Sequence, residues 1–313
     1  MKKFIILTDT TCDLPQAFQD KYDIVILPGH IVLPDKRDIP AFLSWDMYSR
    51  EEFYAELKSN PNSFATSPPN ISEYARAFKQ YATEGYDVLC LTISSGISGA
   101  YNFALAAQKQ VREEYSAANI AVVDTLRFGP AIGLMAVHAA MLREEGKNLE
   151  EVVRHLEENK NRFHQAGWLD DLSFVAKKGR LTHAKAFLGT LAGVKPIGEF
   201  DYNGLTTVIG KAKGAKTAYG VLLTYIKETI QNPAEQIIFI AQTNRYEQAV
   251  KYKALIEEQI KPKAVYIHDV FPSCGINIGP GLMAAYYMGT PISDDLREER
   301  QIVELALNGE MKK

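Results

Sequence analysis

The sequence predicts an α/β protein of two three-layer α/β/α domains, the first with a mostly parallel sheet and the second with a mixed sheet. Its 313 residues are enough for about two domains. Short β-rich runs alternate with amphipathic helical segments, which is typical of layered α/β folds. The pattern changes after Phe163, where a hairpin signal interrupts the alternation. We therefore expect an N-terminal domain over residues 1–163 and a C-terminal domain over residues 164–313.

In the first half, short apolar runs bounded by turn residues predict strands, and longer segments with helical periodicity predict helices. The expected strands are residues 4–7, 24–27, 88–93 and 120–123. The expected helices are residues 15–22, 51–59, 71–83, 99–115 and 132–145. The charged segment "NLEEVVRHLEENKNRF" predicts one more helix, which closes this half.

In the second half, Asn203-Gly204 stands between two β-prone runs, and this dipeptide is a strong signal for a two-stranded hairpin. A helix over residues 215–230, a strand over 236–241, a helix over 245–260 and a strand over 264–270 are expected to follow. The tail "SDDLREERQIVELALNGEMKK" predicts a terminal helix. An antiparallel hairpin beside strands joined by helices makes this second sheet mixed.

Composition excludes several classes of partner. The formal net charge of -3 gives no general attraction to nucleic acid or to an anionic membrane. Cys12, Cys90 and Cys274 are scattered, and their spacing suggests neither a disulfide framework nor a zinc site. No cluster of His and Cys has the spacing of metal ligands, so we expect no metal and no cofactor.

The N-terminus "MKKFIILTDTTCD" places two lysines before an apolar run, as a secretory signal does. That run ends after four residues, which is shorter than a secretory core. No stretch approaches the roughly 18 apolar residues of a membrane span. We therefore expect a cytoplasmic protein.

Four polar loops carry unusual chemistry: "TDTTCDLP" at 8–15, "ATSPPN" at 65–70, "SSGISGA" at 94–100 and "CGINIGPG" at 274–281. The first and third follow expected strands, and the carboxyl ends of strands line the ligand crevice of open α/β sheets. A turn between a strand and a helix leaves unpaired backbone N–H groups at the positive end of the helix, and serine hydroxyls add further donors, so the third loop suits an anion. A phosphate, the oxyanion of a hydrolysis reaction and the carboxylate of a ligand are the three candidates.

Two other interpretations compete. Ser98 and Asp13 can be simple helix N-caps, each worth about 1 kcal/mol. Alternatively, "GISGA" resembles the Gly-x-Ser-x-Gly nucleophile elbow with Ala100 in the last position, so Ser98 could serve a serine hydrolase or esterase. A triad also needs a histidine and an acid. Of six histidines only His268 stands near a strand end, and nothing in the sequence connects it with Ser98.

A nucleotide site is less well supported. "GKAKGAKT", from Gly210 to Thr217, resembles a Walker A loop but carries Ala215 at the second glycine position, where the backbone must approach phosphate closely. A basic surface turn before a helix explains these residues better. No basic stripe with interleaved aromatic residues indicates binding to single-stranded nucleic acid.

Taken together, the loops resemble the DegV family of bacterial fatty-acid-binding proteins over residues 1 to about 290. "TDTTCDLP", "TSPPN" and "SSGISGAY" are similar to the family's first three motifs in order. "VVDTLRFG" is a loose match to a Val-Asp-Ser segment. "KKGRL" followed by "KPIGEFDYNG" resembles a Lys-Lys-Gly-Gly-Arg-Ile turn and a hairpin, and "INIGPG" resembles the family's Gly-Pro-Gly segment.

The resemblance implies a two-domain carrier that is not an enzyme and that holds a long-chain fatty acid in a tunnel between the domains. By motif position, Thr66 and Ser98 would contact the carboxylate, with Ser95, Ser67 and Asn277 nearby. The resemblance further implies that a fatty acid kinase phosphorylates the carboxylate to an acyl-phosphate for phospholipid synthesis. In that scheme Arg180, Lys178 and Lys213 would face the kinase.

Three departures from the family pattern concern this scheme. The family's histidine before Ile-Gly-Pro-Gly is Asn277 here, an amide that cannot change its charge. The Gly-Gly-Arg turn is reduced to Lys178-Gly179-Arg180, and Gly129 and Ala131 replace a serine and a glycine after the Val-Asp-Ser segment. We expect fatty-acid binding to survive these changes, whereas transfer to a kinase depends more directly on Asn277.

Overall fold

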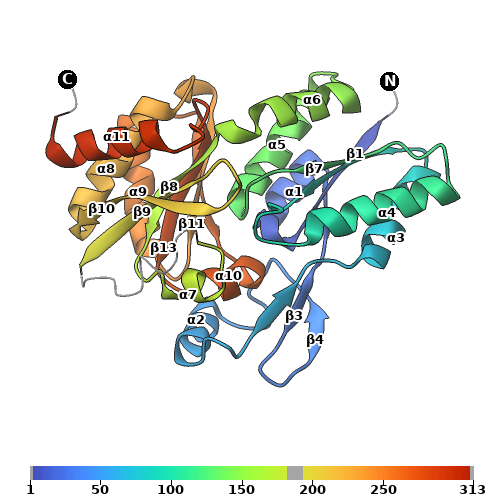
Figure 1. Cartoon of the computed structure of the whole chain (residues 1–313), viewed down its shortest axis with the longest axis horizontal. Coiled ribbons are helices and arrows are strands. Elements are labelled where there is room, and N and C mark those ends of the chain that lie inside the picture. The colour runs from blue at the N-terminus through green and yellow to red at the C-terminus, as the bar shows by residue number, and fades with distance from the viewer. Residues whose placement is uncertain (1–2, 182–192, 311–313) are drawn as a thin grey trace. The chain divides into compact units, whose positions relative to one another are not determined.

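The computed structural model describes residues 3–181 and 193–310 and forms two compact units (Figure 1). Unit 1 comprises Met1–Trp45, Asn62–Lys160 and Phe271–Ile276. Unit 2 comprises Asp46–Pro61, Asn161–Val270 and Asn277–Lys313. Each half of the sequence therefore contributes one short segment to the unit that is formed mainly by the other half.

A four-stranded parallel sheet forms the centre of unit 1. Its strands, in the order β2-β1-β6-β7 across the sheet, are β1 (Phe4–Asp9), β2 (Ile24–Leu27), β6 (Asp87–Thr92) and β7 (Ile120–Asp124). Leu7 pairs with Val25 on one side and with Cys90 on the other. Both faces of this sheet are covered, which is why these strands read as nearly continuous apolar runs. The expected first-half strands are confirmed.

Unit 1 also contains a small antiparallel sheet that the sequence analysis did not predict. Its strands are β3 (His30–Val32), β4 (Asp38–Pro40) and β5 (Ala65–Ser67), in the order β4-β3-β5. Each strand has only three residues. Such short runs contain too few alternating positions to give a periodic signal.

Five α-helices lie wholly in the described part of unit 1: α1 (Gln16–Tyr22), α3 (Ile71–Thr83), α4 (Ala100–Glu114), α5 (Pro130–Glu144) and α6 (Leu149–Asn159). Two of them, α3 and α6, begin with a side-chain cap. A reciprocal capping box pairs Asn70 with Glu73 at α3 and Asn148 with Glu151 at α6. In such a box each side chain accepts a hydrogen bond from the other residue's backbone N–H, which defines the first turn.

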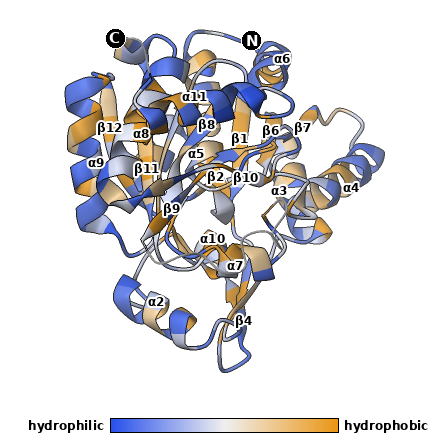
Figure 2. Cartoon of the chain, turned by 60° about the vertical axis from the view of Figure 1, so that its left-hand side comes forward, coloured by the Kyte–Doolittle hydropathy of each residue, from blue (hydrophilic) through white to orange (hydrophobic). Residues whose placement is uncertain are grey.

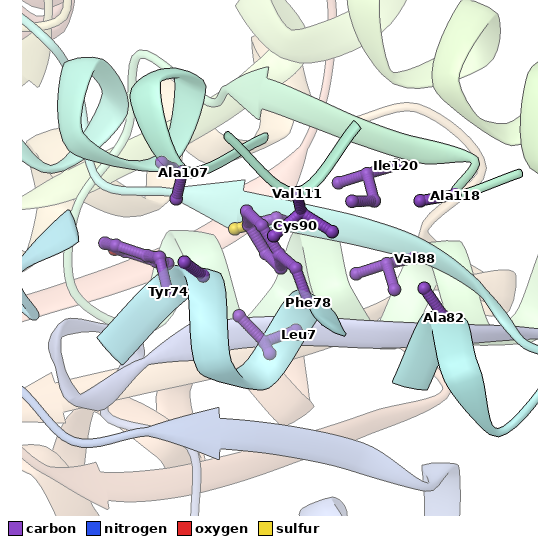
Figure 3. Close-up of a cluster of buried hydrophobic side chains, with 12 residues drawn as sticks. Leu7, Tyr74, Phe78, Ala82, Val88, Cys90, Ala107, Val111, Ala118 and Ile120 are labelled. Atoms are coloured by element: carbon purple, nitrogen blue, oxygen red, sulfur yellow. The ribbon is translucent and has the colours of Figure 1, made fainter. Parts of the chain in front are cut away.

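Helices α3 and α4 cover one face of the parallel sheet with a dense apolar cluster (Figure 3). Tyr74 and Phe78 from α3 are directed toward Leu7 of β1 and Cys90 of β6, and Val111 of α4 closes the cluster. All five side chains are almost completely inaccessible to solvent. Helices α5 and α6 pack against each other, and they also contact strands of this sheet, α5 at β1 and α6 at β7.

A six-stranded mixed sheet forms the centre of unit 2, in the order β10-β9-β8-β13-β11-β12. Its strands are β8 (Phe163–Leu169), β9 (Val194–Phe200), β10 (Thr206–Lys213), β11 (Ile237–Gln242), β12 (Ala264–Asp269) and β13 (Leu282–Met288). Gly204, with φ of 78°, closes the β9–β10 hairpin, as the Asn-Gly signal predicts. The parallel β11–β12 pair makes the sheet mixed.

The helices of unit 2 are α2 (Arg50–Ser59), α7 (Ser173–Lys177), α8 (Gly214–Thr229), α9 (Tyr246–Gln259) and α11 (Arg297–Asn308), and α10 (Pro272–Ile278) spans the boundary residue Asn277. In Figure 2 the strands are largely apolar, whereas the outer turns of α9 and α2 are hydrophilic. Helix α2 joins unit 2 through Arg50, whose Nη1 lies 2.7 Å from Asp269 Oδ1. The Tyr54 hydroxyl also donates to Val270 O over 2.7 Å.

Two expectations about loops are wrong. Most of the segment 274–281 is helical, because α10 extends to Ile278 and only the Gly-Pro-Gly residues form a turn. Lys211-Ala212-Lys213 is not a basic turn: it forms the end of strand β10, where it pairs with β9. In both segments glycines suggested a loop, and pairing or packing with distant residues decided otherwise.

A fully buried polar network lies within the six-stranded sheet of unit 2. His164 Nδ1 lies 2.8 Å from Glu199 Oε2, and both side chains are inaccessible to solvent. Glu199 also accepts hydrogen bonds from the backbone of Gln165 and Phe200 and from the Tyr225 hydroxyl. A buried carboxylate needs several donors of this kind, so the network ties β8, β9 and α8 to one register.

Within residues 3–181 and 193–310, no helix is long and apolar enough to cross a membrane. The same ranges contain no group of three or more His, Cys, Asp or Glu side chains arranged to hold a metal ion.

The α5–α6 packing predicts a pH dependence of stability. His138 Nε2 lies 2.9 Å from His155 Nε2, and burial together with the neighbouring His155 lowers the pKa of His138 from 6.5 to about 4. The unfolded chain thus takes up this proton more readily than the folded chain does. The stabilisation is complete above the unfolded pKa and is lost as the pH falls toward the folded pKa.

We expect the free energy of unfolding to fall by about 3 kcal/mol from this group as the pH decreases across that interval, at about 1.4 kcal/mol per pH unit. Urea unfolding of the wild type and of His138→Gln over the interval measures it. The variant should lose this part of the pH dependence. Identical slopes for both proteins would contradict the assignment to His138.

Candidate functional site

In the parallel sheet of unit 1, the strand order reverses between β1 and β6. From β1 the chain passes to β2 on one side, and it later returns to place β6 on the other side. The loops that follow β1 and β6 therefore leave the sheet in opposite directions, and such a switch point opens a ligand crevice at the carboxyl ends of the strands. Thr10–Asp13 of the motif "TDTTCD" and Ser94–Gly99 of the motif "SSGISGA" lie in these two loops, as the sequence predicted.

Thr10 brings distant segments of unit 1 to the end of β1. Its Oγ1 receives hydrogen bonds from Gly29 N over 3.3 Å and from Ser273 Oγ over 2.9 Å. Gly29 in turn lies against the last residue of β5: a Cβ at this position would stand 2.8 Å from Ser67 O. Glycine is therefore required for this close approach.

The β6 loop is held by the loop that follows β7. Ser94 N donates to Arg127 O over 2.9 Å, and Ser95 N donates to Asp124 Oδ1 over 3.1 Å. The β7 loop also approaches Asp13, because a Cβ at Gly129 would lie 3.7 Å from Asp13 Oδ2. Contacts within unit 1 thus join the loops after β1, β6 and β7 with the 65–70 segment.

Most backbone N–H groups of the serine loop already have acceptors. Six of the seven from Ser94 to Ala100 bond within the unit: Ser94, Ser95, Gly96, Ile97, Ser98 and Ala100. The expectation that this turn offers a row of unpaired amides is therefore wrong. A ligand anion at this loop must be bound chiefly by hydroxyl groups.

Ser98 is placed to donate such a bond. Its Oγ accepts from Ala100 N over 3.2 Å, which leaves the hydroxyl hydrogen available for another acceptor. Ser98 is half-buried and Ser95 is exposed. Ser98 is not the N-cap of α4, because that position belongs to Gly99, which makes no side-chain cap.

The side chains of Thr66 and Ser67 lie on opposite faces of strand β5. Thr66 pairs with Ile31 and Ser67 pairs with His30 across the β3–β5 ladder. Directly opposed residues share a face, and successive residues alternate between faces. Thr66 thus lies on the side of buried Ile31, and Ser67 lies on the side of His30. Only one of the two hydroxyls can face a given ligand directly.

Two buried carboxyl groups stand at the end of β1. Asp9 accepts from Thr11 N over 2.7 Å and from the Thr11 hydroxyl, and burial raises its pKa. Asp13 Oδ1 accepts from Phe271 N over 2.9 Å. Asp13 has φ of 48° after a short 3₁₀ turn and is not a helix N-cap, because that position before α1 belongs to Pro15.

Arg127 is a buried cation that the sequence analysis missed. Its side chain is completely inaccessible to solvent, and Nη1 donates to Leu126 O over 2.7 Å. Arg127 follows β7 in the segment "VVDTLRFG". Its position just after the carboxyl end of a predicted strand was the signal that could have identified it. Cys12 and Cys274 are buried in the same unit, and burial raises the pKa of both thiols well above its usual value, which keeps them protonated.

The described histidines bond to groups other than Ser98. His30 contacts Asp38 and Glu73, His138 and His155 contact each other, and His164 contacts Glu199. His268 is buried with its ring centroid 4.1 Å from that of Phe239. His183 lies outside the described residues. These contacts supply no Ser-His pair of the kind that a hydrolase needs.

In unit 2, Asn277 precedes a turn that requires glycine at two positions. Gly279 and Gly281 have φ of 78° and 105°, and a Cβ on Gly279 would stand 2.5 Å from the Phe174 ring. Asn277 itself is half-buried in the last turn of α10. The Gly-Pro-Gly turn thus fixes how the chain passes from Asn277 into β13.

The basic residues of unit 2 lie on two segments. Lys178 is the C-cap of α7, Gly179 has φ of 73°, and the half-buried Arg180 donates through Nη1 to Lys178 O. The next residue, Leu181, bridges to Thr206 at the start of β10. Lys213 is exposed at the far end of that strand.

Comparison with known proteins identifies similar chains over nearly the whole length. A family profile described as "Uncharacterised protein, DegV family" matches residues 3–289. The DegV domain-containing protein CPE0026 of Clostridium perfringens is 32% identical over 289 residues, which covers 92% of this chain and 98% of that protein.

Two solved structures are also similar. Protein TM841 of Thermotoga maritima, described as having a fatty acid binding function, is 26% identical with a TM-score of 0.79, covering 92% of this chain and 100% of that one. DegV of Bacillus subtilis, described as a fatty acid binding protein, is 26% identical with a TM-score of 0.77, covering 93% and 100%.

Proposed function

Because the chain belongs to the DegV family, we propose that it binds one long-chain fatty acid and holds the carboxylate with the hydroxyls of Thr66 and Ser98. The observation that carries this proposal is the state of Ser98, whose Oγ is engaged as an acceptor by Ala100 N and keeps its hydrogen for a ligand. Ser95 and Asn277 supply further polar groups. The acyl chain occupies an apolar tunnel.

The hydroxyl set suits an anion that must remain reactive. A desolvated carboxylate needs several hydrogen bonds, and those to a charged group are the strong ones. Hydroxyl donors satisfy it without a covalent or ionic bond to its oxygens, so one oxygen stays accessible to a phosphoryl group. The acyl chain supplies most of the affinity: about sixteen carbons at about 0.8 kcal/mol per buried methylene give roughly 10 kcal/mol before ordering costs.

We further propose that the protein is a carrier that presents the bound acid to a fatty acid kinase. The basic residues Arg180, Lys178 and Lys213 support this role, because an arginine fork can hold a phosphate or a carboxylate through two parallel bonds. Binding, without hydrolysis, is the favoured activity, because the histidines with described contacts bond to groups other than Ser98.

The first prediction concerns the ligand. The purified protein should carry a long-chain fatty acid, because the hydrophobic gain makes micromolar or tighter binding attainable. Native mass spectrometry and analysis of the extracted lipid test this, and the ligand-free protein should gain thermal stability with palmitate. A bare chain mass with no thermal shift on adding palmitate would refute the proposed function.

The second prediction concerns the carboxylate contacts. Thr66→Ala and Ser98→Ala should each weaken fatty-acid binding about tenfold or more, since a hydrogen bond to a charged group contributes about 1.5–3 kcal/mol. Ser67→Ala is the matched control: it removes the neighbouring hydroxyl on the opposite face of β5 and should change affinity little. Fluorescent fatty-acid displacement measures all three.

If Thr66→Ala and Ser98→Ala both retain wild-type affinity, the carboxylate is bound elsewhere. Hydrolysis of model esters that is lost only in Ser98→Ala would favour the esterase instead.

The third prediction concerns transfer to the kinase. Arg180→Ala should leave fatty-acid binding intact but reduce acyl-phosphate formation by a cognate kinase, most strongly at low salt, where electrostatic steering is least screened. Lys177→Ala, which removes an exposed charge from the same segment, is the control. Kinase turnover is measured against carrier concentration. Equal turnover for wild type and Arg180→Ala would contradict a role of Arg180 in transfer to the kinase.

A further inference from the structure

His30 lies between two carboxylates in unit 1. Its Nδ1 is 3.3 Å from Asp38 Oδ1 on β4, and its Nε2 is 3.0 Å from Glu73 Oε2 on α3. A neutral imidazole carries only one N–H, so it would turn a lone pair toward one of the carboxylates. The geometry therefore suits the imidazolium, in which both ring nitrogens donate.

Glu73 connects this imidazole to the 65–70 segment. The same Oε2 that contacts His30 also accepts from Asn70 N over 2.8 Å, and Asn70 Oδ1 accepts from Glu73 N over 3.1 Å. Asn70 ends the "ATSPPN" segment, and two prolines restrict the backbone between it and β5. The position of Glu73 thus affects where the segment that carries Thr66 can lie.

The β3 backbone holds the other end of the segment. His30 pairs with Ser67 and Ile31 pairs with Thr66 in the β3–β5 ladder. The segment is therefore fixed at β5 by the ladder next to His30 and at Asn70 by the carboxylate that the His30 side chain contacts. One residue takes part in both attachments.

We propose that His30 is a positioning residue for Thr66, and that its imidazolium, held by Glu73 and Asp38, makes fatty-acid affinity depend on pH. The inference rests on the proposed function, since it assigns Thr66 to the carboxylate. His30 does not touch the ligand: it faces Ser67, on the side of β5 opposite to Thr66. Its effect acts through the backbone of β5 and the Asn70–Glu73 box.

The charges around His30 define the sign of the effect. Asp38 faces it from β4 and Glu73 from α3, β5 contributes only the neutral Ala65–Ser67, and Arg76 of α3 interacts with Glu73. The hydrogen bond with Glu73 is the main cause that raises the pKa of His30. The charged form is thus favoured in the folded protein, and the contact weakens as the pH rises through the folded pKa.

The two carboxylates are not equivalent. The side chains of His30 and Glu73 are 23% and 24% exposed, whereas that of Asp38 is 59% exposed. Solvent screens the exposed pair more strongly, and exposed ion pairs contribute little. Glu73 is therefore the partner that matters, and Asp38→Asn provides a matched control that leaves the Glu73 contact in place.

The test measures palmitate affinity by displacement of a fluorescent fatty acid from about pH 6 to pH 9, an interval that starts near the ordinary pKa of histidine and extends upward, the direction in which the pKa of His30 is shifted. Wild-type affinity should fall as the pH rises. His30→Gln, which keeps a hydrogen-bonding group but no charge, should bind about two- to fivefold more weakly at the acidic end and show a flat profile. Asp38→Asn should follow the wild type.

A double-mutant cycle separates positioning from general destabilisation. If His30 acts through Thr66, His30→Gln should add little to the loss already caused by Thr66→Ala. A wild-type pH profile in His30→Gln, or fully additive losses in the double variant, would overturn the inference while fatty-acid binding stands. Failure of the wild type to bind palmitate at any pH would instead refute the proposed function, and the role of His30 with it.

Discussion

The reversal of strand order between β1 and β6 is the constraint on which the candidate site depends. Parallel strands present their carboxyl ends at one edge, and only at a reversal do two adjacent loops diverge from that edge. Here those loops carry the hydroxyl-rich motifs. Thr10 holds Gly29 and Ser273 at the end of β1, and Arg127 O holds Ser94 at the end of β6. Backbone and hydroxyl contacts thus hold the loops together at this edge of the sheet.

Hydroxyl groups are suitable donors at this edge because most backbone N–H groups of the serine loop already have acceptors. Six of the seven N–H groups from Ser94 to Ala100 have acceptors within the unit. Asp9 and Asp13 add buried carboxyl groups that bond to the chain itself. In the proposed function, an incoming carboxylate finds donors in side chains such as Ser98, whose hydroxyl accepts one bond and can donate another. This arrangement supports binding and disfavours nucleophilic attack.

Regular elements with strong local signals were predictable, and short or glycine-rich ones were not. The helix at Ile71–Thr83 has both a periodic apolar face and a capping pair, Asn70 and Glu73, so its bounds follow from local sequence. The three-residue strands β3, β4 and β5 have no such signal, and pairing alone defines them. Helix α10 was predicted as a loop because it contains Gly275 and is followed by Gly-Pro-Gly, and its apolar residues are too few to give a helical period.

The sequence by itself determined the alternation of strands and helices, the hairpin at Asn203-Gly204, the family and the residue types of the candidate site, because each of these is written in local order and spacing. The tertiary structure decided which of these groups can act together. It placed Thr66 and Ser67 on opposite faces of β5, buried Arg127, and enclosed His30 between Asp38 and Glu73. These outcomes depend on pairing between residues far apart in the chain, and no local pattern encodes the face or the partner that such pairing selects.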